Sequence, residues 1–129
     1  MKEFLAVAAG GAFGAVCRYL VYVLAGQILG AGFPFGTLIV NIVGSFIMGV
    51  LVEGAALAWT MGPQLRLFLV VGTLGAFTTF STFSLDVAVL YERGRLGLVA
   101  GYILISMICS IGALFAALYV MRRIYSPVF

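Results

Sequence analysis

The chain has 129 residues, of which 64% are apolar and only 9% are charged, and its formal net charge is +3. Soluble domains carry about 25% charged residues, so this composition excludes an ordinary soluble domain. We expect one all-α membrane domain, residues 1–129, with four apolar segments long enough to cross a bilayer at about 20 residues each. The positive charges are too few and too scattered to indicate binding of nucleic acid.

The first predicted helix covers residues 4–25. Small residues at Gly10 and Gly14 favour close contact with another helix. Arg18 lies inside the apolar run, where an arginine usually faces a partner or a water-filled cavity; snorkelling to the nearby interface is the alternative. A cleaved signal peptide is an alternative for the whole segment, but the apolar run continues past Arg18, so we expect a retained helix.

The second predicted helix covers residues 35–57 and carries a polar stripe. Thr37, Asn41 and Ser45 are spaced i, i+4, i+8, which places them on one face. A carboxamide at membrane depth needs hydrogen-bond partners, so Asn41 either joins two helices or lines a functional site. The residue spacing leaves both interpretations open.

The third predicted helix, residues 65–91, carries the most unusual stretch of the chain. Between Gly72 and Ser84, hydroxyl groups alternate with phenyl rings and glycines. Each hydroxyl at bilayer depth must find a partner, so a run of them indicates the lining of a site. The glycines, the clustered hydroxyls and the length of the segment predict a helix that is broken near its middle.

The fourth predicted helix covers residues 96–121 and has a second polar stripe. Tyr102, Ser106 and Ser110 repeat the i, i+4, i+8 spacing. Two polar stripes, together with Phe80 and Phe83 on the third helix, indicate one converging lane. A random scatter of hydroxyl residues among membrane helices is the alternative.

The sequence contains few groups that could carry out catalysis or hold a transition metal. It has no histidine, and its two cysteines both fall inside predicted spans, where they act as small packing residues. There is no nucleophile–base pair, metal-ligand cluster or phosphate-binding loop in the sequence. We therefore expect that the protein is not an enzyme.

Lysine and arginine are divided almost evenly between the two sides of the predicted membrane domain. Four spans place Lys2, Arg66, Arg122 and Arg123 on one side, and Arg93 and Arg95 on the other, with Arg18 nearer to the second. A difference in the number of lysine and arginine residues between the two sides sets the direction in which a membrane protein inserts. In this chain that difference is small. We predict that copies insert both ways and pair as an antiparallel two-fold homodimer. A single fixed orientation is the alternative.

Three motifs together resemble the Fluc family of small fluoride channels, and the resemblance covers essentially the whole chain. The strongest match is Gly75-x-x-Thr78-Thr79-Phe80-Ser81-Thr82-Phe83-Ser84. The segment Phe35-Gly36-Thr37-Leu38-x-Val40-Asn41-x-x-Gly44-Ser45 is similar to the second helix of that family, and Gly14-Ala15-x-x-Arg18 to the first. The chain has Asp86 where many relatives have glutamate.

The resemblance implies an antiparallel dual-topology homodimer with two narrow pores, each built from both subunits. It also implies a break in the third helix around residues 75–79, where the backbone carbonyls of Gly75 and Thr78 from both copies hold a structural Na⁺ on the two-fold axis. The residues that it places along the pores are Thr37, Asn41, Phe80, Ser81, Thr82, Phe83, Tyr102, Ser106 and Ser110, with Arg18 toward the entrance.

The chemistry of these residue types agrees with transport of a small anion. Hydroxyl and amide groups donate hydrogen bonds that replace water around fluoride, and the positive edges of phenyl rings attract an anion. We predict passive fluoride export across a prokaryotic inner membrane. Two alternatives are a proton-coupled exporter of cationic drugs, which the arginine in the first helix disfavours, and a non-transporting assembly subunit whose polar stripes only join helices.

Overall fold

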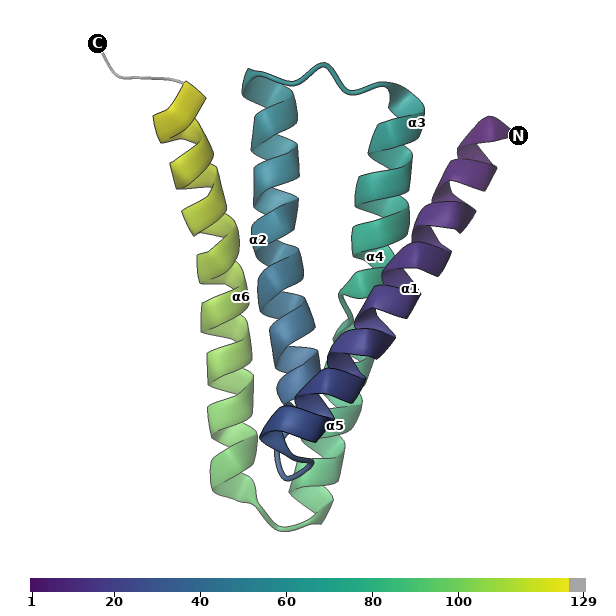
Figure 1. Ribbon diagram of the computed structural model, residues 1–129. Coiled ribbons are helices and arrows are strands. Elements are labelled where there is room, and N and C mark those ends of the chain that lie inside the picture. Colours follow the sequence, from purple (N-terminus) through teal and green to yellow (C-terminus); the bar gives the residue numbers. More distant parts are fainter. Residues whose placement is uncertain (126–129) are drawn as a thin grey trace.

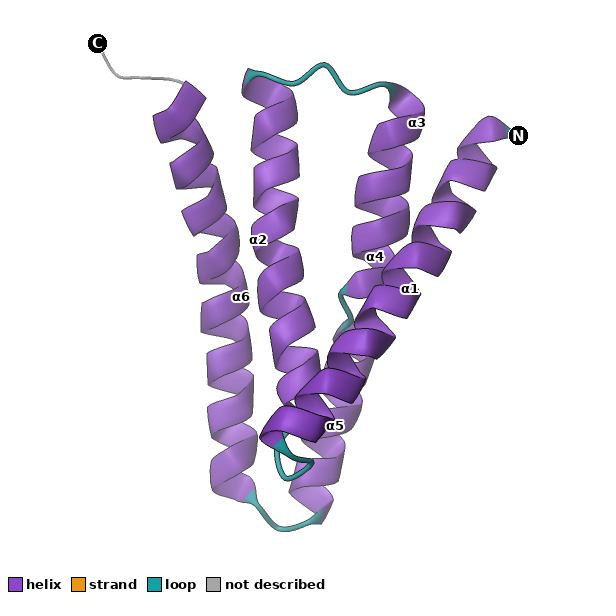
Figure 2. Ribbon diagram, in the orientation of Figure 1, coloured by secondary structure: helices purple, strands orange, loops and turns teal. Residues whose placement is uncertain are grey.

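The structure is a computed structural model that describes residues 1–125. Within that range every regular element is helical (Figure 2). The elements are α1 (Lys2–Leu29), α2 (Phe35–Leu57), α3 (Pro63–Arg66), the π-helix η1 (Leu67–Leu74), α4 (Gly75–Phe77), α5 (Phe80–Glu92) and α6 (Leu96–Tyr125).

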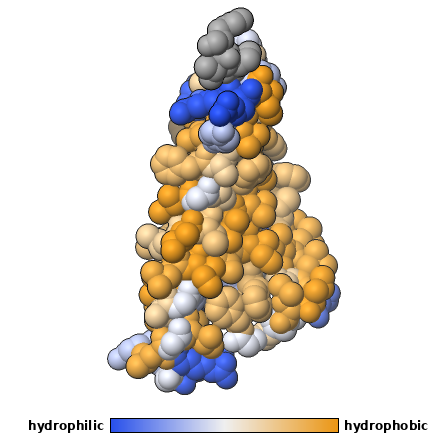
Figure 3. Space-filling model, turned by 90° about the vertical axis from the view of Figure 1, so that its left-hand side faces the viewer, coloured by the Kyte–Doolittle hydropathy of each residue, from blue (hydrophilic) through white to orange (hydrophobic). Residues whose placement is uncertain are grey.

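Four segments are long and apolar enough to cross a membrane, and the third of them consists of α3, η1, α4 and α5 in succession. The observed helical segments are longer than the predicted ranges 4–25, 65–91 and 96–121. The helices extend past the apolar runs and include small and polar residues at their ends. The face seen in Figure 3 has a broad apolar band with hydrophilic patches at its two ends.

The segments form an open V (Figure 1). The start of α1, the end of α6 and the α2–α3 connection lie at the open end, whereas the α1–α2 and α5–α6 connections lie at the narrow end. α2 packs mainly against α6, and α1 packs mainly against η1. At the open end, Arg122 of α6 donates a hydrogen bond from Nε to Oε1 of Glu53 on α2 (2.6 Å) and so joins these two helices.

The contact between α1 and η1 depends on glycine. A Cβ atom at Gly10 would meet the carbonyl oxygen of Phe68, and a Cβ atom at Gly14 would meet that of Thr73. Small residues at such positions let two helix backbones approach closely in a membrane, where packing rather than water exclusion drives association. The Thr73 hydroxyl donates to the Phe68 carbonyl (2.9 Å), a bond that matches the wide i→i+5 turn of η1.

Two small groups of buried side chains flank the middle of the molecule. Val40, Leu74 and Phe77 form one group, where α2 meets the end of η1 and α4. Phe83, Leu90 and Tyr102 form the other, where α5 meets α6. One group contains Phe77, just before the junction between α4 and α5, and the other contains Phe83, just after it, and of the two threonines of that junction Thr79 is buried and Thr78 is half-buried.

Candidate functional site

The helix ends at Phe77 and starts again at Phe80, and the two residues between have extended backbone. Thr78 has φ −81° and ψ 160°, and Thr79 has φ −157° and ψ 123°. The Thr79 hydroxyl accepts a hydrogen bond from the N–H of Thr82 (3.2 Å), which caps the N-terminus of α5. The Thr78 hydroxyl donates to the carbonyl of Leu74 (2.9 Å), which closes the end of α4. Side-chain hydroxyls therefore satisfy backbone groups on both sides of the junction.

Asn41 of α2 holds this junction from the neighbouring helix. Its Oδ1 accepts a hydrogen bond from the N–H of Thr79 (2.8 Å), and its Nδ2 donates to the carbonyl of the same residue (2.9 Å). The carboxamide thus pairs with Thr79 as another strand would, and one N–H of the amide remains for a further acceptor. Asn41 both joins two helices and lines the cavity described next, so the two interpretations left open by its spacing are compatible.

A cavity of about 240 Å³ lies beside the junction and brings together polar groups from three helices. Its lining includes Asn41, Ser45, Thr79, Phe80, Phe83, Ser106 and Ser110. The hydroxyl oxygens of Ser106 and Ser110 are buried, and neither has a hydrogen-bond partner within residues 1–125. Buried hydroxyls are nearly always paired, so these two are available to water, to an ion or to another chain.

The two phenyl rings of the cavity differ in their surroundings. The ring centroids of Phe80 and Phe83 lie 5.5 Å apart. Phe83 is 8% exposed and packs against Tyr102, with ring centroids 5.2 Å apart, whereas Phe80 is 75% exposed on the single chain. The Phe83 ring is therefore held by contacts within its own chain, whereas the Phe80 ring is open to contact with lipid or with another chain.

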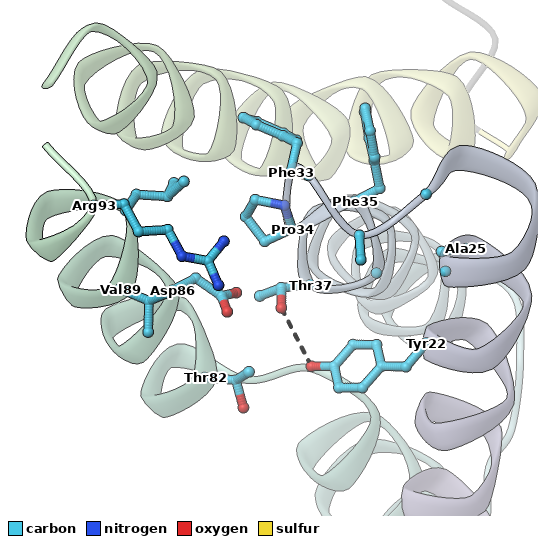
Figure 4. A pocket seen from close by; sticks show the side chains of 16 residues that line it. Tyr22, Ala25, Phe33, Pro34, Phe35, Thr37, Thr82, Asp86, Val89 and Arg93 are labelled. Carbon is cyan, nitrogen blue, oxygen red and sulfur yellow. Dashed lines mark hydrogen bonds between the residues drawn. The ribbon is translucent and has the colours of Figure 1, made fainter. Parts of the chain in front are cut away.

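A second cavity, of about 380 Å³, lies toward the narrow end of the V (Figure 4). Tyr22, Thr37, Thr82, Asp86 and Arg93 supply its polar groups. The Thr37 hydroxyl donates to the Tyr22 hydroxyl (3.5 Å) across the space between α1 and α2. The guanidinium of Arg93 extends into the cavity on the same side as the Asp86 carboxylate (Figure 4). This cavity therefore has a guanidinium group and a carboxyl group at its wall.

A hydrogen bond between two threonine hydroxyls connects the walls of the two cavities. The Thr79 hydroxyl, which belongs to the first cavity, donates a hydrogen bond to the hydroxyl of Thr82, which belongs to the second (3.1 Å). Tyr102 is fully buried between the two, with its ring against Phe83 and its hydroxyl donating to Oδ2 of Asp86 (3.0 Å). The Thr79–Thr82 pair and the Tyr102 side chain therefore each contact residues of both cavities.

The predicted site residues divide between these places. Asn41, Phe80, Phe83, Ser106 and Ser110 line the first cavity, and Thr37 and Thr82 line the second. Ser81 is exposed, with its hydroxyl 3.3 Å from that of Thr79. Arg18 is half-buried and lines neither cavity. Gly75 is the first residue of the short helix α4, and Thr78 caps its C-terminus.

The sequence did not single out two polar residues of the second cavity, Tyr22 and Arg93. Tyr22 lies one helical turn after Arg18 on the same face of α1, and that i, i+4 spacing of polar groups was the available signal. Arg93 stands in the α5–α6 connection, where nothing in the sequence separates it from Arg95.

Comparison with known proteins places the chain in one family. A family model described as "CrcB-like protein, Camphor Resistance (CrcB)" matches residues 5–118. Three bacterial relatives, each named fluoride-specific ion channel FluC, are similar over nearly the whole chain. The relative from Agrobacterium fabrum is 56% identical over 97% of this chain and 100% of its own length. The relative from Rhodospirillum centenum is 55% identical over 95% and 97%, and that from Chelativorans is 50% identical over 96% and 99%. By this extent of match, the chain belongs to the CrcB family.

Proposed function

We propose that this chain is a multi-pass membrane protein that forms a passive fluoride-selective channel and lets the cell export fluoride down its electrochemical gradient. The setting is the inner membrane of a bacterium, which fits the bacterial origin of the relatives. Those relatives are named fluoride-specific ion channels and are similar to this chain over nearly its whole length. The proposal rests on this family membership and on the chemistry of the first cavity.

The observation that carries the proposal is the pair of unpartnered serine hydroxyls. Fluoride is small and strongly hydrated, so a pore must supply close hydrogen-bond donors in place of water. Ser106 and Ser110 provide two such donors one turn apart, with no competing partner within residues 1–125, and Asn41 lines the same cavity. Conduction also requires that no single site be too deep, and neutral donors meet this need better than a fixed cation would.

The phenyl rings complete the anion's surroundings. A ring carries positive character at its edge, so an anion that meets Phe80 or Phe83 edge-on is attracted. The wide exposure of Phe80 on a single chain supports a pore that is finished by a second copy. We propose that the second copy is inserted in the opposite direction, because the near-equal numbers of lysine and arginine on the two sides give little preference for one orientation.

The proposed sodium ion fits the end of α4. Carbonyl oxygens suit a hard alkali cation, and the last carbonyls of a helix have no intrahelical donor. Gly75 and Thr78 lie where the helix stops, so their carbonyl oxygens are candidates to hold the ion together with the same residues of a second copy. The ion would supply a fixed positive charge at the centre of the dimer and lower the cost of holding anions nearby.

Liposomes that contain only this purified protein are expected to release fluoride when a fluoride gradient is imposed, as measured with a fluoride-sensitive electrode. Chloride-loaded liposomes are the matched control and should release much less, because chloride is larger and gains less from close hydrogen-bond donors than fluoride does. A well-folded dimer that passes neither ion would contradict the proposal and would favour an assembly subunit. Uptake of a cationic drug driven by protons would favour the exporter.

A tag at the C-terminus is expected on both sides of the membrane in similar amounts. The measurement is labelling of intact and of permeabilised cells with an impermeant reagent. A tagged protein with one known orientation serves as the control for leakage. Detection of the tag only in the cytoplasm would refute dual insertion while leaving the fluoride proposal to its own test.

A further inference from the structure

At the α4–α5 junction, side chains bond the backbone N–H groups that the helix break releases, but not the backbone carbonyls that it releases. In an uninterrupted α-helix, the N–H of Thr79 would bond the carbonyl of Gly75, and the N–H of Thr82 would bond the carbonyl of Thr78. In this protein, Asn41 Oδ1 accepts from the N–H of Thr79 (2.8 Å), and the Thr79 hydroxyl accepts from the N–H of Thr82 (3.2 Å). Two side chains therefore satisfy the two donors, and the two carbonyls lose the bonds that a continuous helix would give them.

The geometry also holds the junction open. Asn41 Nδ2 donates to the carbonyl of Thr79 (2.9 Å), so the carboxamide grips this residue on both its N–H and its C=O side. Thr79 is 8% exposed, and the extended ψ of 160° at Thr78 turns the N–H of Thr79 away from α4. The nearby bonds from Thr78, through N–H (3.0 Å) and hydroxyl (2.9 Å), both end on the carbonyl of Leu74. Neither of them takes up the carbonyl of Gly75.

We propose that Asn41 and Thr79 are positioning residues that keep the carbonyl oxygens of Gly75 and Thr78 free for a cation. A carbonyl without a donor costs free energy at membrane depth, and a hard cation satisfies several such oxygens together. Asn41 and the Thr79 hydroxyl bond the N–H groups of Thr79 and Thr82, which would otherwise compete with a cation for these oxygens. This inference rests on the proposed sodium site and assigns to Asn41 a role toward the cation in addition to any role as a donor to the anion.

The chain offers matched variants for a test. Thr79→Val keeps the shape and removes the acceptor for the N–H of Thr82, whereas Thr79→Ser keeps the acceptor. Asn41→Leu removes the acceptor for the N–H of Thr79 from a different helix. Thr73→Val is the control, because it also deletes a hydroxyl that bonds backbone in the same segment, but that hydroxyl donates to a carbonyl and frees no N–H.

The readout is the thermal unfolding midpoint of the full chain in detergent, in NaCl and in N-methyl-D-glucamine chloride. The parent and Thr79→Ser should unfold at a higher temperature in NaCl. Thr79→Val and Asn41→Leu should lose most of this sodium-dependent shift, because the released N–H groups compete for the carbonyls. Thr73→Val should have a lower midpoint in both salts with the shift intact. A full sodium shift in Thr79→Val and Asn41→Leu would overturn the inference.

Amide hydrogen exchange on the unmodified protein supplies a second test that needs no variant. The amides of Thr79 and Thr82 should be protected in both salts, because side chains rather than the ion hold them; rapid exchange at both would overturn the inference. Fluoride release from liposomes is measured on the same preparation. A parent that conducts fluoride but shows no sodium shift refutes the cation site and this inference alone, whereas a parent that does not conduct refutes the proposed function.

Discussion

Replacing Phe80 with isoleucine is expected to lower fluoride release from liposomes by about tenfold or more, because losing about 1.4 kcal/mol of attraction for the ion in transit changes a rate by that factor. Isoleucine is also apolar but has no ring edge to present to an anion. Since Phe80 is 75% exposed on the single chain, its replacement disturbs little packing within the subunit. Dimer formation, measured by size-exclusion chromatography with light scattering, should be unchanged.

The control for this prediction is Phe115→Ile. Phe115 is also largely exposed and lies on the side of α6 away from Ser106, so it removes a ring at a place that borders neither cavity. Its fluoride release should match the parent. Equal release from the parent and from Phe80→Ile would remove this ring from the mechanism. Phe83→Ile is the less specific variant, because the Phe83 ring also packs against Tyr102.

Replacing Gly14 with alanine is expected to destabilise the protein by about 1 to 3 kcal/mol, the usual cost of forcing extra atoms into a well-packed contact. The added Cβ would meet the carbonyl oxygen of Thr73 and lie 2.9 Å from its carbonyl carbon, so α1 and η1 would have to separate. Both partners are backbone, which cannot rotate away as a side chain does. The measurement is the thermal unfolding midpoint of the detergent-solubilised protein.

Gly11→Ala is the matched control on the same helix. A Cβ atom at Gly11 has no other atom within 4 Å, and alanine is the better helix former by about 1 kcal/mol. This variant should therefore be as stable as the parent or more stable. If Gly14→Ala and Gly11→Ala unfolded at the same temperature, the close contact between α1 and η1 would not contribute to stability.

Composition and periodicity were sufficient to predict four apolar helical segments, since those properties are local. They also grouped Asn41 and Ser45 with Ser106 and Ser110, which do share a cavity. The spacing did not predict that Thr37 and Tyr102 separate from their stripes. A helical period fixes the face of a helix but not which neighbour meets it at each depth, and Thr37 meets Tyr22 of α1. The partners of Asn41 were equally hidden, because both of its bonds go to the backbone of a segment 38 positions away.

The π-helix was not predicted, because the apolar run Leu67–Leu74 has the same composition whether its bonds close at four residues or at five. The π-helix affects how many residues separate the two backbone positions that contact α1. The two carbonyls that face the glycines of α1 belong to Phe68 and Thr73, five positions apart, whereas Gly10 and Gly14 are four apart. Five residues of a π-helix span about the same turn as four residues of an α-helix, so these two carbonyls lie one turn apart, as the two glycines do. In homologous sequences that keep both glycines, a gap of one residue within this stretch should therefore be tolerated, because an ordinary α-turn would still place two carbonyls one turn apart.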